Sequence, residues 1–329
     1  MLARTALCSW WFNHACAFGR SWFGPAQAEL LAETSRWVDQ LEHLLASDAN
    51  PRQLASVLTR LWPLWSALGR MEWAAQHLDA LLERDDHDPD ERFQACWALA
   101  WLALALNDVA RADAAIATAS ASPPATVAAG AALDQICGIR SLYAGNPQAA
   151  GALLRRALDH HVDAGPDSDV FLDLSFLAAA ASCEGDLPTA YDLCERAVAL
   201  CERHGERWLR NYVLWALALA AWRDGDRNRA YVLALDGVDI AASGGDQHAG
   251  AICLEIVAWY EAHGGDATTA AELLGVADGI RVATRIPTLY LGAEEFQGHA
   301  REEAGVGRPP EVSGYPFLGA TRLPAVWDV

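Results

Sequence analysis

The sequence repeats a short turn signal at intervals of 38 to 40 residues. Each signal is a pair of turn-forming residues, and an alanine follows the second of them four positions later in all six cases. The second residues of successive pairs are 38, 38, 40, 40 and 40 positions apart. A fixed period of this length predicts a stack of structural repeats. The pairs are Gly69-Arg70, Asn107-Asp108, Gly145-Asn146, Gly185-Asp186, Gly225-Asp226 and Gly265-Asp266, and the alanines are Ala74, Ala112, Ala150, Ala190, Ala230 and Ala270.

Each repeat has the pattern of a helical hairpin. A glycine in the left-handed conformation ends the first helix, and the Asp or Asn beside it caps the second. A further small residue lies eight positions before the second turn residue in every repeat except the first, where Trp62 takes its place. Two small residues allow the helices to cross closely. We expect four leucines to fill the remaining space: Leu153, Leu193, Leu233 and Leu273.

These patterns predict an all-α fold, an α-solenoid of about six antiparallel helical hairpins in a right-handed superhelix. We call the first helix of each hairpin the A helix and the second the B helix. Polar linkers such as Asp85 to Asp90 and Ser120 to Pro124 separate the hairpins. We expect an entry region at 1–50, the repeat array at 51–285, and a helix with a Pro- and Gly-rich tail at 286–329. The predicted A helices span 92–106, 126–144, 169–184, 207–223 and 248–263.

Composition excludes several functions. All 24 basic residues are arginine, a bias typical of GC-rich bacterial genomes, and without lysine the chain has no Walker-type phosphate loop and no Schiff-base nucleophile. A formal charge of −19 with scattered arginines argues against direct contact with nucleic acid. Catalytic signatures such as His-Glu-x-x-His and Gly-x-Ser-x-Gly are absent from the sequence. We therefore expect no enzyme activity, no cofactor and no metal.

The cysteines and the apolar segments predict a cytoplasmic protein. The eight cysteines form no Cys-x-x-Cys pair and lie mostly within apolar helical stretches, as expected of reduced core thiols. The apolar run from Cys96 to Leu106 stops well short of the roughly 18 residues of a membrane span. The N-terminal stretch has a short apolar run, but His14 and Arg20 interrupt any leader-like pattern. We expect neither export nor membrane association.

The repeats resemble the tetratricopeptide repeat, with longer helices than its usual period. Two stretches resemble more specifically the repeat region of bacterial ATPase-linked transcriptional regulators of the LuxR and AfsR type. They are Trp22-Phe23-Gly24-Pro25-Ala26-Gln27, followed by Leu61 to Trp65, and the run Ala270 to Asp278. The resemblance implies a sensor and partner-binding role. It departs from the family at Ser35 to Leu45, and neither the ATPase nor the helix-turn-helix domain of such regulators is found in this sequence.

Projecting the A helices onto the concave side of a tetratricopeptide stack gives a candidate binding groove. Five residues share one position, and two tryptophans share another, one turn later. Aromatic side chains with a few polar groups suit an extended peptide, an apolar helix or a small aromatic molecule. The candidate groove residues are Trp97, Trp101, Gln135, Tyr143, Ser175, Trp215, Trp222, Glu255 and Trp259.

Simpler interpretations remain open for these residues. Tryptophans spaced by four and seven residues also pack one A helix against the next. Glu255 and Arg223 form either a charged pair in the groove or two solvated charges. The adjacent His160 and His161 point about 100° apart on a helix, so they do not suit one metal ion.

Two functions fit these observations. The first is a scaffold that holds a protein or peptide partner on its concave face. The second is a sensor module of a split regulator, which binds a small effector and docks on separately encoded chains. The repeat pattern supports the first and the family resemblance supports the second.

Overall fold

A computed structural model shows an all-helical chain. It describes residues 2–46, 50–84, 88–121, 126–164, 167–244, 247–284 and 294–309. The linker residues 85–87, 122–125 and 165–166 and the predicted tail from residue 310 onward lie outside these residues. The described part contains 17 helices and no strand, which confirms the predicted all-α helical-repeat solenoid. The same part has no helix that is both long and apolar enough to cross a membrane.

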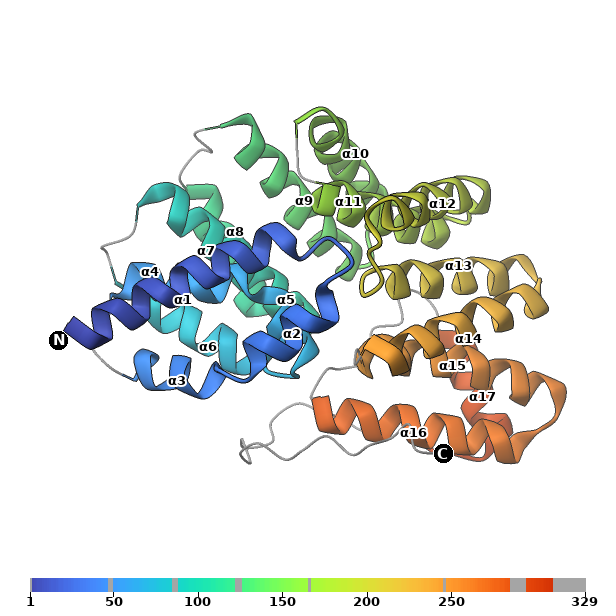
Figure 1. The fold of residues 1–329 in the computed structure, drawn as a ribbon. Coiled ribbons are helices and arrows are strands. Elements are labelled where there is room, and N and C mark those ends of the chain that lie inside the picture. The colour runs from blue at the N-terminus through green and yellow to red at the C-terminus, as the bar shows by residue number, and fades with distance from the viewer. Residues whose placement is uncertain are drawn as a thin grey trace. The chain divides into compact units, whose positions relative to one another are not determined.

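The chain divides into two compact units, which we describe separately. Unit 1 comprises Met1–Asp173 with Arg203–Glu206, and unit 2 comprises Leu174–Glu202 with Arg207–Val329, so that the division falls within α11. Figure 1 shows the helices of both. Unit 1 begins with α1 (Leu2–Ser21), α2 (Gln27–Ser35) and α3 (Val38–Leu45). Its first hairpin pairs α4 (Pro51–Arg60) and α5 (Trp62–Ala67) with α6 (Met71–Leu82).

The remaining hairpins have one helix on each side of the turn. In unit 1 these are α7 (Pro89–Ala105) with α8 (Val109–Ala121) and α9 (Val127–Tyr143) with α10 (Pro147–Ala164). Helix α11 (Asp167–Glu184) precedes α12 (Leu187–His204). Unit 2 continues with α13 (Arg210–Asp224) and α14 (Arg227–Gly244), then α15 (Gln247–Gly264) and α16 (Ala267–Thr284), and ends at α17 (Glu294–Ala304). The predicted A helices are confirmed to within a few residues at each end.

All six predicted turns contain a residue in the left-handed conformation. The φ angle is 62° at Gly69, 56° at Asn107 and 73° to 87° at the four later glycines. In five turns the next N–H bonds back to a carbonyl five residues earlier, for example Asp266 to Glu261 at 2.9 Å. The predicted caps are also present, except in the first turn, where arginine stands. The side chains of Asp108, Asn146, Asp186, Asp226 and Asp266 each accept a hydrogen bond from the N–H three residues later.

The small residues lie where paired helices cross. All six alanines after the turns are at most 1% exposed, as are Ala100, Ala178, Ala218 and Ala258. At Gly138 on α9, an added Cβ would come within 2.7 Å of Leu154 Cγ on α10. The leucine prediction is confirmed for Leu193, which is buried, and is off by one position at Leu153 and Leu273. Leu153, Leu233 and Leu273 are only half-buried, whereas Leu154 and Leu274, eight residues after the cap, are completely buried.

Helix α17 continues the repeat beyond the predicted end of the array at residue 285. It packs against α15 and α16, and the three helices lie side by side in Figure 1. It ends at Gly305, 40 residues after Gly265, with a φ of 70°. Val306 follows where the other turns have Asp, Asn or Arg, which hides this turn in the sequence. Helix α17 therefore takes the place of a further A helix.

Helix α1 is joined to the first hairpin by one apolar stripe. Its buried residues are three or four positions apart and face α4. By contrast, the buried residues of α2 are both polar, Gln27 and Thr34. Helix α3 again buries apolar residues. The chain thus enters through two helices anchored by apolar packing, with a weakly packed helix between them. The stripe of α1 and the residue after it consists of Cys8, Trp11, Ala15, Phe18 and Trp22.

The adjacent glycines Gly264 and Gly265 at the end of α15 allow a test of the left-handed turn. Gly265 has a φ of 86°, where a Cβ is strained, whereas Gly264 is helical with open space around its Cβ position. We expect Gly265→Ala to lower the free energy of unfolding by about 1–2 kcal/mol. Gly264→Ala should leave it unchanged or raise it. Urea denaturation measures both. Equal effects of the two substitutions would contradict a left-handed turn at Gly265.

The crossing of α9 and α10 gives a second matched pair. Gly138→Ala introduces a Cβ against Leu154 and the carbonyl of Ala150, and we expect it to cost about 1–3 kcal/mol of unfolding free energy. Gly130 lies in the same helix with nothing within 4 Å of its Cβ position. Gly130→Ala should therefore stabilise by about 0.5–1 kcal/mol. If thermal unfolding shows Gly138→Ala to be as stable as Gly130→Ala, the helices do not cross closely here.

Candidate binding surface on the A helices

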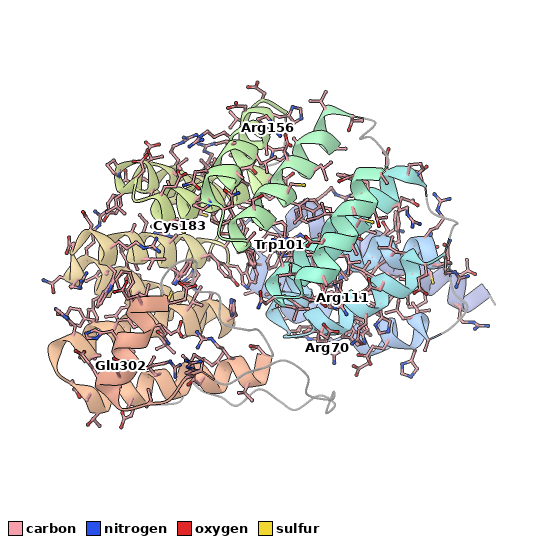
Figure 2. The ribbon with its side chains drawn as sticks, turned by 180° about the vertical axis from the view of Figure 1, so that it is seen from behind. Arg70, Trp101, Arg111, Arg156, Cys183 and Glu302 are labelled. Atoms are coloured by element: carbon pink, nitrogen blue, oxygen red, sulfur yellow. The ribbon has the colours of Figure 1, made fainter. Side chains whose placement is uncertain are left out.

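An aromatic cluster lies on the A helices of unit 1. Trp97 and Trp101 of α7 stack with centroids 5.9 Å apart and planes 9° apart, and Trp62 of α5 meets Trp101 edge-on at 5.1 Å. All three side chains are half-buried. The indole Nε1 of Trp97 is buried and has no hydrogen-bond acceptor. Figure 2 labels Trp101 within this cluster. The arrangement combines partly exposed apolar ring surface with a buried donor that has no acceptor.

Gln135 of α9 shares its repeat position with Trp97, but it is buried within a polar network. Its amide nitrogen donates to Asp173 Oδ1 at 3.0 Å and to the carbonyl of Asp169 at 3.2 Å, both on α11. His161 of α10 bonds through Nδ1 to Asp173 Oδ2 at 2.6 Å. Three side chains thus join an A helix, its B helix and the next A helix. We call Gln135, His161 and Asp173 the first polar bridge.

Two ionisable groups at this bridge, His161 and the neighbouring Asp169, have raised pKa values. Burial opposes the charged form of His161, but the hydrogen bond and negative charge of Asp173 outweigh it and raise the pKa of the imidazole. Burial also raises the pKa of the half-buried Asp169 to about 6, and the neighbouring Asp173 adds to the shift. Both groups therefore bind protons more strongly in the folded chain than in the unfolded one.

A second polar bridge occurs in unit 2. Glu255 of α15 is paired with Arg281 of α16, with Oε1 and Nη2 2.6 Å apart. Gln297 of α17 donates to the same carboxylate oxygen at 2.7 Å, and its own carbonyl accepts the indole N–H of Trp259. All four side chains are at most 3% exposed. We call Glu255, Arg281 and Gln297 the second polar bridge, which again joins an A helix, its B helix and the next A helix.

The two bridges use equivalent positions. Gln135 and Glu255 each lie 11 residues before the cap residue of their turn, and His161 and Arg281 each lie 15 residues after it. In the other repeats, the described residues at these positions are Thr59, Trp97, Ser175 and Trp215 at the first and Cys201 and Ala241 at the second. Among the repeats for which both positions are described, one in each unit places an ionisable side chain at this crossing.

The aromatic residues of unit 2 pack between A helices. Trp222 of α13 and Trp259 of α15 meet at 5.6 Å, and Phe296 of α17 lies 5.8 Å from Trp259 and 6.4 Å from Trp222. Both tryptophans are at most 5% exposed, and the half-buried Trp215 packs against the same core. The simpler interpretation of the tryptophan spacing therefore holds for Trp222 and Trp259.

The structure separates the predicted groove residues into two groups. Gln135, Trp222, Glu255 and Trp259 are buried, so they do not line an open surface, because the next A helix covers each of them. The half-buried members are Trp97, Trp101, Tyr143, Ser175 and Trp215.

The suggested Glu255–Arg223 pair is wrong, since Glu255 pairs with Arg281 and Arg223 donates to Ser182 Oγ at 2.6 Å. Sequence reasoning also missed Asp173, Arg281 and Gln297. The shared position of His161 and Arg281 was the available signal. Within the described ranges, no group of three or more His, Cys, Asp or Glu side chains is arranged to hold a metal ion.

Comparison with known proteins defines a class of fold. No protein-family model matches the chain, and no curated protein matches it in sequence. Solved structures do match: the chain is similar to tetratricopeptide-like helical-repeat proteins. One is a tetratricopeptide repeat protein from Parabacteroides merdae, with a TM-score of 0.49 at 14% identity, covering 83% of this chain and 98% of that one.

Two further matches are Rap proteins. A Rap protein in complex with competence and sporulation factor has a TM-score of 0.62 at 10% identity, and the match covers 91% of this chain and 86% of that one. The apo form of RapI has a TM-score of 0.51 at 11% identity, covering 77% and 72%. At such low identities the likeness concerns the fold alone.

The half-buried Asp169 predicts an unusual pH dependence. Its folded pKa is about 6, and an ordinary aspartate titrates near 4, so the folded chain holds a proton that the unfolded chain has lost in between. The free energy of unfolding therefore falls as the pH rises from about 4 to 6 through this group. We expect Asp169→Asn to match the parent at pH 4 and to exceed its stability by about 1–3 kcal/mol at pH 7.

Urea denaturation at several pH values measures this difference. Asp163→Asn, at an exposed aspartate of α10, is the control and should show no such pH-dependent gain. If the difference in unfolding free energy between Asp169→Asn and the parent is the same at every pH in this range, burial does not disfavour the charged form of Asp169.

Proposed function

We propose that this chain is a non-catalytic helical-repeat scaffold that holds a segment of a protein or peptide partner on its A-helix side. The observation that carries the proposal is the aromatic cluster of Trp62, Trp97 and Trp101 with the unsatisfied N–H of Trp97. A buried donor without an acceptor costs about 1–3 kcal/mol. A peptide backbone presents a carbonyl at every residue, and aromatic faces suit the side chains beside it.

The similarity to the Rap protein that holds competence and sporulation factor supports a binding role for a fold of this kind. It does so at the level of architecture, since function depends on the site and not on the fold. The partner and the place of contact are therefore argued from the side chains of this chain. We propose that the half-buried Tyr143, Ser175 and Trp215 also contact a partner, each from the A helix that carries it.

We further propose that the chain is a cytoplasmic sensor and interaction module related to ATPase-linked regulators of the LuxR and AfsR type. The support is the resemblance of Trp22 to Gln27 and of Ala270 to Asp278. The division into an entry region at 1–50, an array from residue 51 and a C-terminal part at 286–329 belongs to the same proposal, with α17 of the C-terminal part continuing the repeat beyond the predicted end of the array at 285. The alternative ligand is a small effector. An effector at 100 times its dissociation constant adds about 2.7 kcal/mol of stability, which a thermal-shift screen against metabolites detects.

Panning a random dodecapeptide library on the full chain tests the peptide-binding proposal. We expect enriched peptides whose affinity falls by about tenfold in Trp97→Phe, which keeps an aromatic ring, although a smaller one, and removes the N–H donor. Trp101→Ala should lower the affinity for these peptides further, because it removes a stacked ring. Trp37→Phe changes an exposed indole next to α3 and serves as the control. The proposal fails if no peptide is enriched, or if enriched peptides bind both cluster variants as tightly as the parent.

A further inference from the structure

The loop between α1 and α2 contacts residues about 150 and about 180 positions later in the chain. The ring of Phe23 lies 6.0 Å from that of Phe171 and 5.3 Å from that of His204. Pro25 packs against Gly205, where an added Cβ would come within 3.2 Å of the proline Cβ. All of these residues belong to unit 1. The motif Trp22 to Gln27 therefore ties the entry helices to A helix α11 and to the end of α12.

A buried polar contact completes this attachment. The amide nitrogen of Gln27 donates to Glu206 Oε1 at 2.6 Å, and the two side chains are 5% and 1% exposed. A buried carboxylate needs strong donors, and an ionised donor such as guanidinium is roughly twice as strong as a neutral amide. An arginine that reached Glu206 would therefore be bound more strongly than Gln27.

The packing of α2 leaves this segment with little apolar burial to hold it in place. The buried residues of α2 are Gln27, held by Glu206, and Thr34, whose Oγ1 lies 2.9 Å from His14 Nε2. Its leucines, Leu30 and Leu31, are only half-buried. The flanking helices α1 and α3 bury apolar side chains and stay anchored. Elements with little apolar burial open at low free-energy cost.

We propose that Phe23–Ser35 is a strap over unit 1, and that a partner segment with an aromatic and an arginine side chain replaces it at Phe171, His204 and Glu206. The aromatic side chain takes the place of Phe23, and the arginine takes the place of Gln27. This inference rests on the proposed function, because it names the chemistry of a partner for the same scaffold. Helix α2 of the strap contacts α5, the helix that carries Trp62.

Hydrogen–deuterium exchange on the full chain tests the strap. Gln27→Glu sets two carboxylates against each other, and we expect the amides of 27–35 to exchange about tenfold faster, with those of α8 to α10 unchanged. The swapped pair Gln27→Glu with Glu206→Gln restores a donor and an acceptor, so exchange should return to the parent rate. The far-UV circular dichroism of each variant shows that it is folded, and Gln27→Ala gives a milder version of the same opening.

A labelled peptide then tests the partner chemistry. The probe is residues 18–29, FGRSWFGPAQAE, with arginine in place of the glutamine that corresponds to Gln27. We expect Gln27→Glu to bind this probe about tenfold more tightly than the parent, because the strap no longer competes. The probe with glutamine retained should bind less tightly than the arginine probe.

The outcomes separate this inference from the proposed function. The strap is refuted if exchange at 27–35 is unchanged in Gln27→Glu, or if that variant binds the probe no better than the parent. Library peptides that bind parent and Gln27→Glu equally through Trp97 and Trp101 would leave the proposed function standing without the strap. Probe binding to Gln27→Glu with no library peptide bound through the cluster would support the strap alone.

Discussion

The close crossing of paired helices at small residues is the constraint on which the other features depend. An alanine four residues after each cap and a small residue eight before it let the backbones approach, and both are buried completely or nearly so. The approach requires a tight reversal, which the left-handed turn residue supplies, and a defined start of the B helix, which the cap supplies. Each turn therefore fixes the crossing beside it. The same three elements recur in five of the six hairpins, and the first lacks both the cap and the small residue of its first helix, where Trp62 stands.

The architecture was predictable from sequence because it rests on local rules. Gly265 and Asp266, for instance, indicate the end of one helix and the start of the next from local sequence alone. The same rules failed where the signal was incomplete. Gly305 ends a further A helix, but Val306 carries no capping side chain and gave no indication of a turn. The one-position error at Leu153 and Leu154 arose because the two leucines are adjacent in the sequence, and only packing decides which is completely covered.

The candidate site was far less predictable, since its decisive contacts join distant residues. A periodic projection placed Gln135 and Glu255 in a groove with Trp97, because it assumed that equivalent positions have equivalent surroundings. In the structure the next A helix covers both polar residues and leaves Trp97 half-exposed. Nor does any local pattern connect Gln27 with Glu206. Contacts of this kind depend on how the repeats stack, which a period alone does not determine.

The two polar bridges bear on how a chain of similar repeats avoids misassembly. Apolar crossings of alanine and leucine are nearly interchangeable, so one hairpin can pair with the wrong neighbour at little cost. A histidine that requires Asp173, or an arginine that requires Glu255, tolerates only one neighbour, because a mispaired charge would be buried without a counterion. Each bridge is therefore expected to favour one order of the hairpins in its unit. Loss or duplication of a single repeat next to a bridge would break that order, whereas the same event between two apolar crossings would merely change the length of the stack.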